Sequence, residues 1–397
     1  MGRVGVCPRF LALAKDAGVW TDLFRNIFPV PAYCRAIPAI NHIPDFFARM
    51  ITIAVDGMGS DNSPYNEIDG VIQAAKAYDV KVILVGKESV LAPMLKSAGG
   101  DGLPIEIRNA TEVVAMDESP IAALRKKRDS SIRIAANLVS ERIAAGLVSA
   151  GNTGAVMATS KMVLGMVPGV DRPALATVLP TLTGCAVLLD VGANVVCKPH
   201  HLLQFAVMEH LFSKKVLGVA SPKVGLMSVG EEESKGNDLV KEVHQMLKQL
   251  DLNFIGNVEG RDLYNGRADV IVCDGFTGNV ALKTSEGLIE AMQKLMKEEL
   301  SRNLQSKLGA ALSLSAFRRL KKRLDYSEYG GAPLLGLRGV SIICHGRSSG
   351  NAIKNAIRVA KEFSENQVDA MLENELNRIG VEQYELPPEA VAGNSGY

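Results

Sequence analysis

The chain has few aromatic residues, almost no net charge and no apolar run that could cross a membrane. Aromatic residues make up 5% of the 397 residues, and the formal net charge is +1. Such a balanced charge gives no global attraction to nucleic acid, so a basic site would have to be a local patch. The longest apolar runs are far shorter than the roughly 20 residues that span a bilayer. The composition therefore favours a globular protein without a nucleic-acid partner.

Cysteine is also scarce, with six residues and no Cys-x-x-Cys pair. We therefore predict neither a disulfide framework nor a structural metal site, and free thiols fit a reducing cytoplasm. The chain has no G-x-G-x-x-G after a strand and no G-x-x-x-x-G-K-[ST], so neither a dinucleotide site nor a P-loop is predicted. We expect no cofactor.

Residues 1–49 differ in composition from the rest of the chain. Five prolines interrupt every helix-forming stretch except a short one near 11–28: Pro8, Pro29, Pro31, Pro38 and Pro44. The segment lacks the charged region, apolar core and small-residue cleavage site of a secretory signal. We interpret it as an appendage. The favoured explanation is a start codon set upstream of a true start at Met50, and a docking tail is the rival.

From Ile51 onward, apolar runs alternate with helix-forming stretches. The runs are 51–55, 80–85, 105–107, 143–148, 186–190, 224–229, 254–256, 270–273 and 340–344. Continuous apolar runs are typical of parallel strands that are covered on both faces. The sequence therefore predicts an α/β/α sandwich around a mostly parallel sheet. We assign residues 50–375 to one domain and residues 376–397 to a C-terminal tail.

Two glycine loops after predicted strands share the pattern Gly-x-Thr-Gly. They are Gly151-Asn152-Thr153-Gly154 and Gly275-Phe276-Thr277-Gly278. A strand that ends in such a turn and opens a helix presents free backbone N–H groups to an anion. For either loop alone, a turn in which glycine relieves strain is the favoured interpretation. Two matching loops indicate two strand ends that face one pocket.

Other polar residues also follow predicted strands, where ligands bind in open α/β sheets. Candidate ligands for a small oxyanion are Asp56, Asn194, Asp274 and His345. Lys235 is the candidate cation for phosphate or for a developing oxyanion, and a solvated turn lysine is the simpler alternative. The amide of Asn279 could donate to the same group, or Asn279 could cap a helix.

One run of four consecutive cations consists of Arg125, Lys126, Lys127 and Arg128. Such a run is usually a solvated face. Here it is also a candidate docking site for an acidic partner.

An apolar segment with hardly a charge lies at 304–317, and a cluster of cations follows it. We expect a helical hairpin at about 285–325 with this segment at its tip. An apolar tip rimmed by cations has the composition of an interfacial membrane contact. The contact residues would be Leu304, Leu308, Ala311 and Leu312. A dimer interface or a helix packed on the core is an equally good interpretation.

Taken together, these motifs resemble the bacterial phosphate acyltransferases of phospholipid synthesis. The matching segments run in family order over most of the chain: Ile53–Gly59, Ser149–Ala155, Asp171–Ala174, Leu189–Asn194, Gly230–Glu232, Lys235–Asn237, Asp274–Val280 and Tyr329–Ala332. Several long motifs in order make the resemblance specific. Residues 1–49 and the tail after about 375 lie outside it.

The resemblance implies a fold like that of the isocitrate/isopropylmalate dehydrogenases and phosphotransacetylases, and usually a homodimer. It implies transfer of an acyl group from acyl-[acyl carrier protein] to inorganic phosphate. It also implies a cytoplasmic enzyme loosely attached to an anionic membrane, where glycerol-3-phosphate acyltransferase uses the acyl phosphate next. The Gly-x-Thr-Gly loops and Lys235 would then hold phosphate and the thioester oxygen. Either the four cations at 125–128 or the cations after Phe317 would meet the carrier protein.

The expected mechanism is direct attack of a phosphate oxygen on the thioester, without a covalent enzyme intermediate. Lys235 and Asn279 would stabilise the tetrahedral oxyanion. The main alternative is a phosphate acetyl- or butyryltransferase that uses coenzyme A thioesters on the same scaffold. An alternative of a different class is an idle scaffold that recruits lipid enzymes to the membrane.

Overall fold

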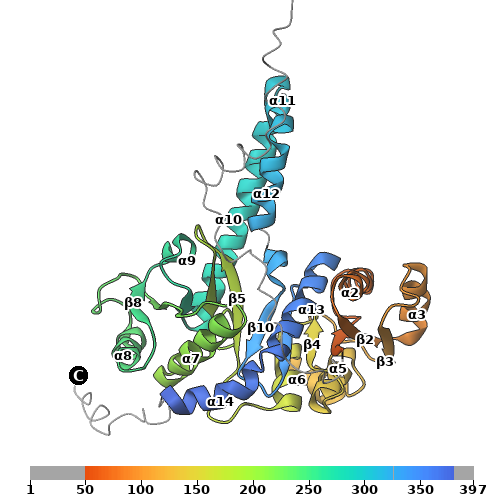
Figure 1. Cartoon of the computed structure of the whole chain (residues 1–397), viewed down its shortest axis with the longest axis horizontal. Helices are drawn as coiled ribbons and strands as arrows, with labels where there is room; N and C mark the ends of the chain where they lie inside the picture. Colours follow the sequence, from red (N-terminus) through yellow and green to blue (C-terminus); the bar gives the residue numbers. More distant parts are fainter. Residues whose placement is uncertain (1–49, 325, 380–397) are drawn as a thin grey trace, which may run out of the picture. The chain divides into compact units, whose positions relative to one another are not determined.

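An eleven-stranded sheet forms the centre of the computed structural model (Figure 1), which describes residues 50–324 and 326–379. The strand order is β3-β2-β1-β4-β11-β10-β5-β6-β9-β7-β8. The bounds are β1 Ile51–Asp56, β2 Val80–Gly86, β3 Ile105–Asn109, β4 Gly146–Ser149, β5 Ala174–Pro180, β6 Cys185–Leu189, β7 Val224–Met227, β8 Phe254–Val258, β9 Val270–Val272, β10 Ala332–Leu335 and β11 Val340–Ile343. The predictions for residues 1–49 and for most of the C-terminal tail lie outside the described residues.

The sheet consists of two parallel halves that run in opposite directions. Parallel pairs join β3, β2, β1, β4 and β11 in one half and β6, β9, β7 and β8 in the other. Antiparallel pairs link β11 to β10, β10 to β5 and β5 to β6, so β6 runs opposite to β11. The prediction of a mostly parallel sheet is therefore confirmed, but the two central strands that reverse its direction, β5 and β10, were not predicted.

Helices cover both faces of the sheet. On one face lie α2 (Tyr65–Ala77), α3 (Glu88–Ser97), α7 (Pro199–Lys215), α8 (Asp238–Leu247), α13 (Gly350–Glu365) and α14 (Val368–Ile379). On the other lie α4 (Pro120–Lys126), α5 (Ser131–Ser140), α6 (Thr153–Leu164), α9 (Asp262–Asn265) and α10 (Gly275–Ser301). Successive strand residues pack on opposite faces: Ile53 belongs to one buried cluster and Ala54 to the other. This two-sided burial explains the continuous apolar runs, and it confirms the predicted α/β/α sandwich.

A helical hairpin projects from the sheet, as Figure 1 shows for α10, α11 (Leu304–Leu312) and α12 (Leu314–Leu324). Helix α10 begins beside the sheet and continues outward. The chain turns back at Arg302 and Asn303, and the side chain of Asn303 caps α11 by accepting a hydrogen bond from the Ser306 N–H. The apolar segment of the sequence therefore forms the outer end of the returning arm, and α11 has no buried residue.

Candidate active site

A cavity of about 600 Å³ lies between β5, the ends of β10 and β11, and the side of α10. Its apolar wall includes Leu175 and Val178 of β5 together with Leu282 and Ile289 of α10. Its polar lining includes Thr153, Asn279, Lys283, His345, Arg347 and Ser348. An apolar wall with a few convergent polar groups is the usual composition of a small-molecule site.

The first glycine loop delivers one side chain to this cavity. Asn152 caps α6: its Oδ1 accepts a hydrogen bond from the Ala155 N–H at 3.0 Å. Its Nδ2 donates to the backbone carbonyls of Ala115, Met116 and Glu118, so the whole amide is engaged. The N–H of Gly151 donates to Ser149 Oγ at 3.1 Å. Thr153 follows the cap, is exposed and lines the cavity.

The second glycine loop is built differently, although its sequence pattern is the same. Helix α10 begins at Gly275, and its cap is Asp274, which accepts hydrogen bonds from the N–H groups of Phe276 and Thr277. The Thr277 hydroxyl donates to Asp274 Oδ2 at 2.8 Å. Asn279 lies in the second turn of the helix, is exposed and lines the cavity. The alternative that Asn279 caps this helix is therefore wrong.

Two buried aspartates organise the strand ends near the loops. The Asp56 carboxylate accepts hydrogen bonds from Ser149 Oγ at 2.7 Å and from the Met58 N–H at 3.1 Å. Asp190 accepts from the N–H and the side-chain amide of Asn194 at 2.6 and 2.9 Å. Loss of hydration raises the pKa of both carboxyls, and these hydrogen bonds oppose the rise. Both aspartates hold loops together from inside the protein.

The turn after β11 contributes three neighbouring residues to the cavity lining: His345, Arg347 and Ser348. His345 is exposed, and its Nδ1 accepts a hydrogen bond from the Arg347 N–H at 3.2 Å. Ser348 is 6% exposed, and its hydroxyl has no hydrogen-bond partner among the described residues. Arg347 and Ser348 were not predicted as site residues. The spacing Gly346-x-Ser348-x-Gly350 between a strand and a helix was the available signal.

Lys235 lies in the loop between β7 and α8, and it is not among the described residues that line the cavity. Its side chain is exposed, and its ammonium makes no hydrogen bond or ion pair with another described residue. Strand β7 is parallel to its neighbour β9, so the Lys235 loop and the start of α10 lie at the same edge of the sheet. The topology therefore brings Lys235 to the edge that carries Asn279, but outside the cavity.

Comparisons with known proteins identify the family of the chain. The family model described as "Fatty acid synthesis protein" matches residues 51–371. A protein of Acidobacterium capsulatum named phosphate acyltransferase is 58% identical over 322 residues, which is 81% of this chain and 96% of that protein. The chain belongs to the phosphate acyltransferase family. A phosphate acyltransferase of Heliobacterium modesticaldum is 54% identical over 311 residues, 78% of this chain and 93% of that protein.

The fold of this family member resembles that of phosphotransacetylases. EutD phosphotransacetylase from Staphylococcus aureus matches with a TM-score of 0.52 and 18% identity, over 79% of this chain and 94% of that chain. At this identity the likeness concerns the fold alone, and it confirms the predicted phosphotransacetylase-like architecture. Family membership also confirms that the chain is an acyltransferase enzyme.

Three cysteines of this acyltransferase, Cys197, Cys273 and Cys344, are poorly suited to nucleophilic attack. Burial raises the pKa of the Cys344 thiol to about 12 and holds that of Cys273 well above its usual value. Partial burial raises the pKa of Cys197 to about 11. Because the thiolate is the nucleophile, these three thiols are inert near neutral pH.

One group of neighbouring side chains in this family member is of the kinds that bind metal ions. Asp171, His200 and His201 offer atoms within 4.8 Å of one another. His201 Nδ1 already accepts a hydrogen bond from the Lys198 N–H at 3.0 Å, so the proton of the neutral ring is on Nε2. Burial lowers the pKa of His201 to about 4. A cation would have to displace either this hydrogen bond or the ring proton, so the group does not fit a metal well.

The remaining predicted contact residues of this acyltransferase are on the surface. Arg125, Lys126 and Arg128 are exposed at the end of α4, whereas Lys127 is partly buried. Leu304, Leu308, Ala311 and Leu312 are all exposed on α11, with Leu304 at 84% and Leu312 at 80%. In residues 50–324 and 326–379, no helix has both the length and the apolar character required to cross a membrane.

Proposed function

We propose that this chain transfers a fatty acyl group from acyl-[acyl carrier protein] to inorganic phosphate and so supplies acyl phosphate for phospholipid synthesis. Family membership supports the reaction class. The observation that carries the proposal is the shared cavity. Thr153 of the first glycine loop and Asn279, which follows the second, belong to opposed halves of the sheet and line the same space. Such a cavity can hold two reactants against each other.

The two substrates fit different parts of the lining. We place the acyl chain against the apolar wall formed by β5 and α10. We place phosphate at the start of α6 and α13, where Thr153, His345, Arg347 and Ser348 line the cavity. Arg347 supplies charge, and the unpartnered Ser348 hydroxyl supplies a hydrogen bond to a bound anion. The other predicted phosphate ligands, Gly151, Asn152, Gly154, Asp56, Asn194, Asp274, Thr277 and Gly278, shape the loops around this site.

The chemistry requires no enzyme nucleophile. An oxygen of hydrogen phosphate attacks the thioester carbonyl and forms the new C–O bond of acyl phosphate. The C–S bond breaks, and the carrier leaves as a thiolate that takes up a proton. In the tetrahedral intermediate the carbonyl oxygen becomes an oxyanion, and the Asn279 amide is placed to donate to it. We keep Lys235 as the second stabilising group, because its loop lies at the same edge of the sheet as the start of α10, which carries Asn279.

Two further proposals concern the location of the enzyme. Exposed leucines on α11, with cations following in α12, support peripheral contact with an anionic membrane on the cytoplasmic side. There, glycerol-3-phosphate acyltransferase would use the product. The exposed apolar side chains of the outer part of α10, Leu288, Met292 and Leu295, lie at helical spacing and support a homodimer through the arm.

The test is a phosphate-dependence assay. The full chain is given palmitoyl-acyl carrier protein, and thiol release is followed with and without inorganic phosphate. We expect release only with phosphate, together with acyl phosphate as product. Release without phosphate would identify a thioesterase and overturn the proposal. A competing coenzyme A thioester should not be consumed, and preferential use of it would favour the coenzyme A alternative.

A further inference from the structure

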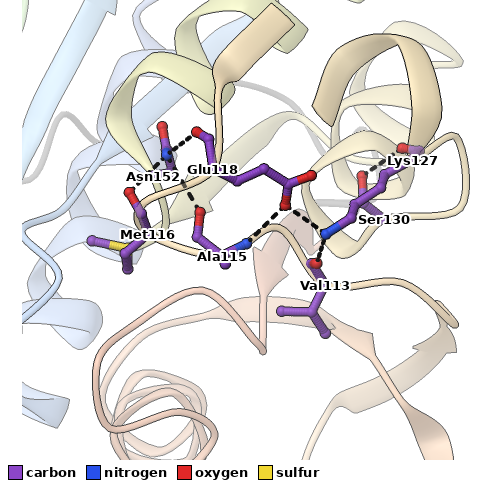
Figure 2. Close-up of polar contacts among 7 residues, drawn as sticks. All are labelled: Val113, Ala115, Met116, Glu118, Lys127, Ser130 and Asn152. Atoms are coloured by element: carbon purple, nitrogen blue, oxygen red, sulfur yellow. Dashed lines mark hydrogen bonds and ion pairs between the residues drawn. The ribbon is translucent and has the colours of Figure 1, made fainter. Parts of the chain in front are cut away.

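One of the four consecutive cations differs from its neighbours in its surroundings. Lys127 is partly buried, and its ammonium lies 2.5 Å from Glu118 Oε2 and donates to the Val113 carbonyl at 2.6 Å (Figure 2). Arg125, Lys126 and Arg128 are exposed, and none of them makes a hydrogen bond or ion pair with another described residue. Lys127 is therefore engaged by its own chain, while the other three cations remain available to a partner.

The segment held by Lys127 is also held by the first glycine loop. Asn152 Nδ2 donates to the carbonyls of Met116 at 2.8 Å and Glu118 at 2.9 Å, as Figure 2 shows. The N–H of Ala115 donates to Glu118 Oε2 at 3.3 Å. Residues 113–118, here called the bridging segment, are thus fixed between the cations and the cap of α6.

The bridging segment and the start of α4 lie against the rim of the cavity on two sides. A Cβ added to Gly346 would lie 2.7 Å from the Met116 methyl group, so Met116 packs on the turn that carries His345 and Arg347. A Cβ added to Gly154 would lie 2.6 Å from Pro120 Cγ, so the first residue of α4 packs beside Thr153. The cations and the phosphate end of the cavity therefore belong to one connected structure.

We propose that Arg125, Lys126 and Arg128 form a docking surface for the acidic acyl carrier protein, and that Lys127 and Glu118 are positioning residues that fix this surface relative to the cavity. The choice of partner rests on the proposed function and on charge complementarity, because three unpaired cations attract an acidic protein. The hydrogen bond from Lys127 holds the pKa of the Glu118 carboxyl below its usual value, so the ion pair persists at neutral pH. A carrier bound here delivers its thioester across Met116 to the cavity rim.

Substitution of a docking residue should change the Kd for the carrier, whereas substitution of a positioning residue should change kcat. Lys126→Glu should raise the Kd for acyl carrier protein about ten-fold or more and weaken the salt dependence of binding, because it reverses a charge at the surface. Lys127→Met should leave this Kd within about two-fold of wild type, since the docking cations remain. It should lower kcat for palmitoyl-acyl carrier protein about ten-fold, because a small misplacement of the reacting group slows the reaction. Lys127→Arg should restore most of kcat.

Two controls complete the experiment. Lys96→Glu makes the same charge change on the exposed surface of α3 and should leave the Kd unchanged. Glu118→Gln removes the other charge of the pair and should reproduce the kcat loss of Lys127→Met without a change in Kd. It keeps the test informative if Lys127→Met fails to fold.

The proposal is overturned if Lys127→Met raises the Kd as strongly as Lys126→Glu, since Lys127 would then be a docking residue. It is also overturned if Lys126→Glu leaves carrier binding unchanged and instead abolishes binding to anionic vesicles. The failure of the proposed function is distinguishable. In that case wild-type protein shows no phosphate-dependent thiol release, while the Kd for the carrier still reports on docking.

Discussion

Gly278 lies so close to Asp190 that a Cβ added to this glycine would fall 2.0 Å from the Asp190 carbonyl oxygen. The start of α10 therefore packs directly on the backbone that follows β6. We predict that Gly278→Ala destabilises the protein by about 3 kcal/mol, because the methyl group forces α10 away from the sheet. Urea unfolding measures this loss, and activity should fall with it because Asn279 moves too.

Gly287 is the matched control in the same helix. It is exposed, and a Cβ added to it meets nothing within 4 Å. Gly287→Ala should therefore stabilise the protein by about 0.5–1 kcal/mol, since alanine loses less conformational freedom than glycine in a helix. Equal destabilisation by both substitutions would contradict the packing argument for Gly278.

The sequence predicted the layers of the fold because buried parallel strands are continuous apolar runs, such as 80–85. It did not predict β5 and β10, both of which contain a proline, and β10 has only four residues. Their antiparallel pairing reverses one half of the sheet, and no local pattern reports such a reversal.

The sequence identified candidate site residues, but for a similar reason it could not tell which of them line the cavity. The glycine loops were recognised, but identical patterns gave different helix starts, so Thr153 is open and Thr277 is bonded to Asp274. Polar side chains after strands are candidates either for ligand binding or for holding the loop. Only the three-dimensional structure distinguishes the buried Asp56 from the exposed His345.

The proposed oxyanion donors give a direct kinetic prediction. Asn279→Ala should lower kcat by about 10²–10³, the usual effect of losing one oxyanion donor, and Lys235→Ala should do the same. Both side chains are exposed, so the melting temperature should stay near that of wild type. Lys241→Ala, on the exposed side of α8, is the control and should retain activity. Unchanged turnover in Lys235→Ala would remove Lys235 from the mechanism.

Because the thiols of Cys197, Cys273 and Cys344 are inert, we predict that the reaction forms no acyl-cysteine intermediate on them. Cys273→Ser and Cys344→Ser should keep turnover within about three-fold of wild type, because neither thiol forms a thiolate near neutral pH. Steady-state rates and thermal melting measure the outcome. A folded but inactive Cys273→Ser protein would show that a covalent intermediate exists after all.

The exposed leucines of α11 predict the membrane contact. Combining Leu308→Glu with Leu312→Glu should weaken binding to anionic vesicles about a hundred-fold or more, because each buried leucine contributes about 1.5–3 kcal/mol. Activity on dispersed substrate should remain. Ile143→Glu, on the exposed turn that precedes β4, is the control. If vesicle binding persists while sedimentation shows dissociated subunits, the leucines serve a dimer interface instead.

The last prediction concerns Glu209 and the dependence of the free energy of unfolding on pH. This carboxyl of α7 is completely buried, and desolvation holds its pKa well above the usual value, against a smaller effect of the Ile271 backbone. In the unfolded chain it ionises near pH 4.3. Between these two pKa values, Glu209 keeps a proton in the folded protein and loses it in the unfolded chain. The free energy of unfolding therefore falls as pH rises above about 4.3 toward the folded pKa.

The substitution Glu209→Gln should remove this loss and stabilise the protein at pH 7 by about 1 kcal/mol or more. The control is Glu298→Gln at an exposed position, which should not change the stability at pH 7. Parallel urea titrations at pH 5 and pH 8 measure both, and equal pH dependence in wild type and Glu209→Gln would show that Glu209 is ionised in the folded protein.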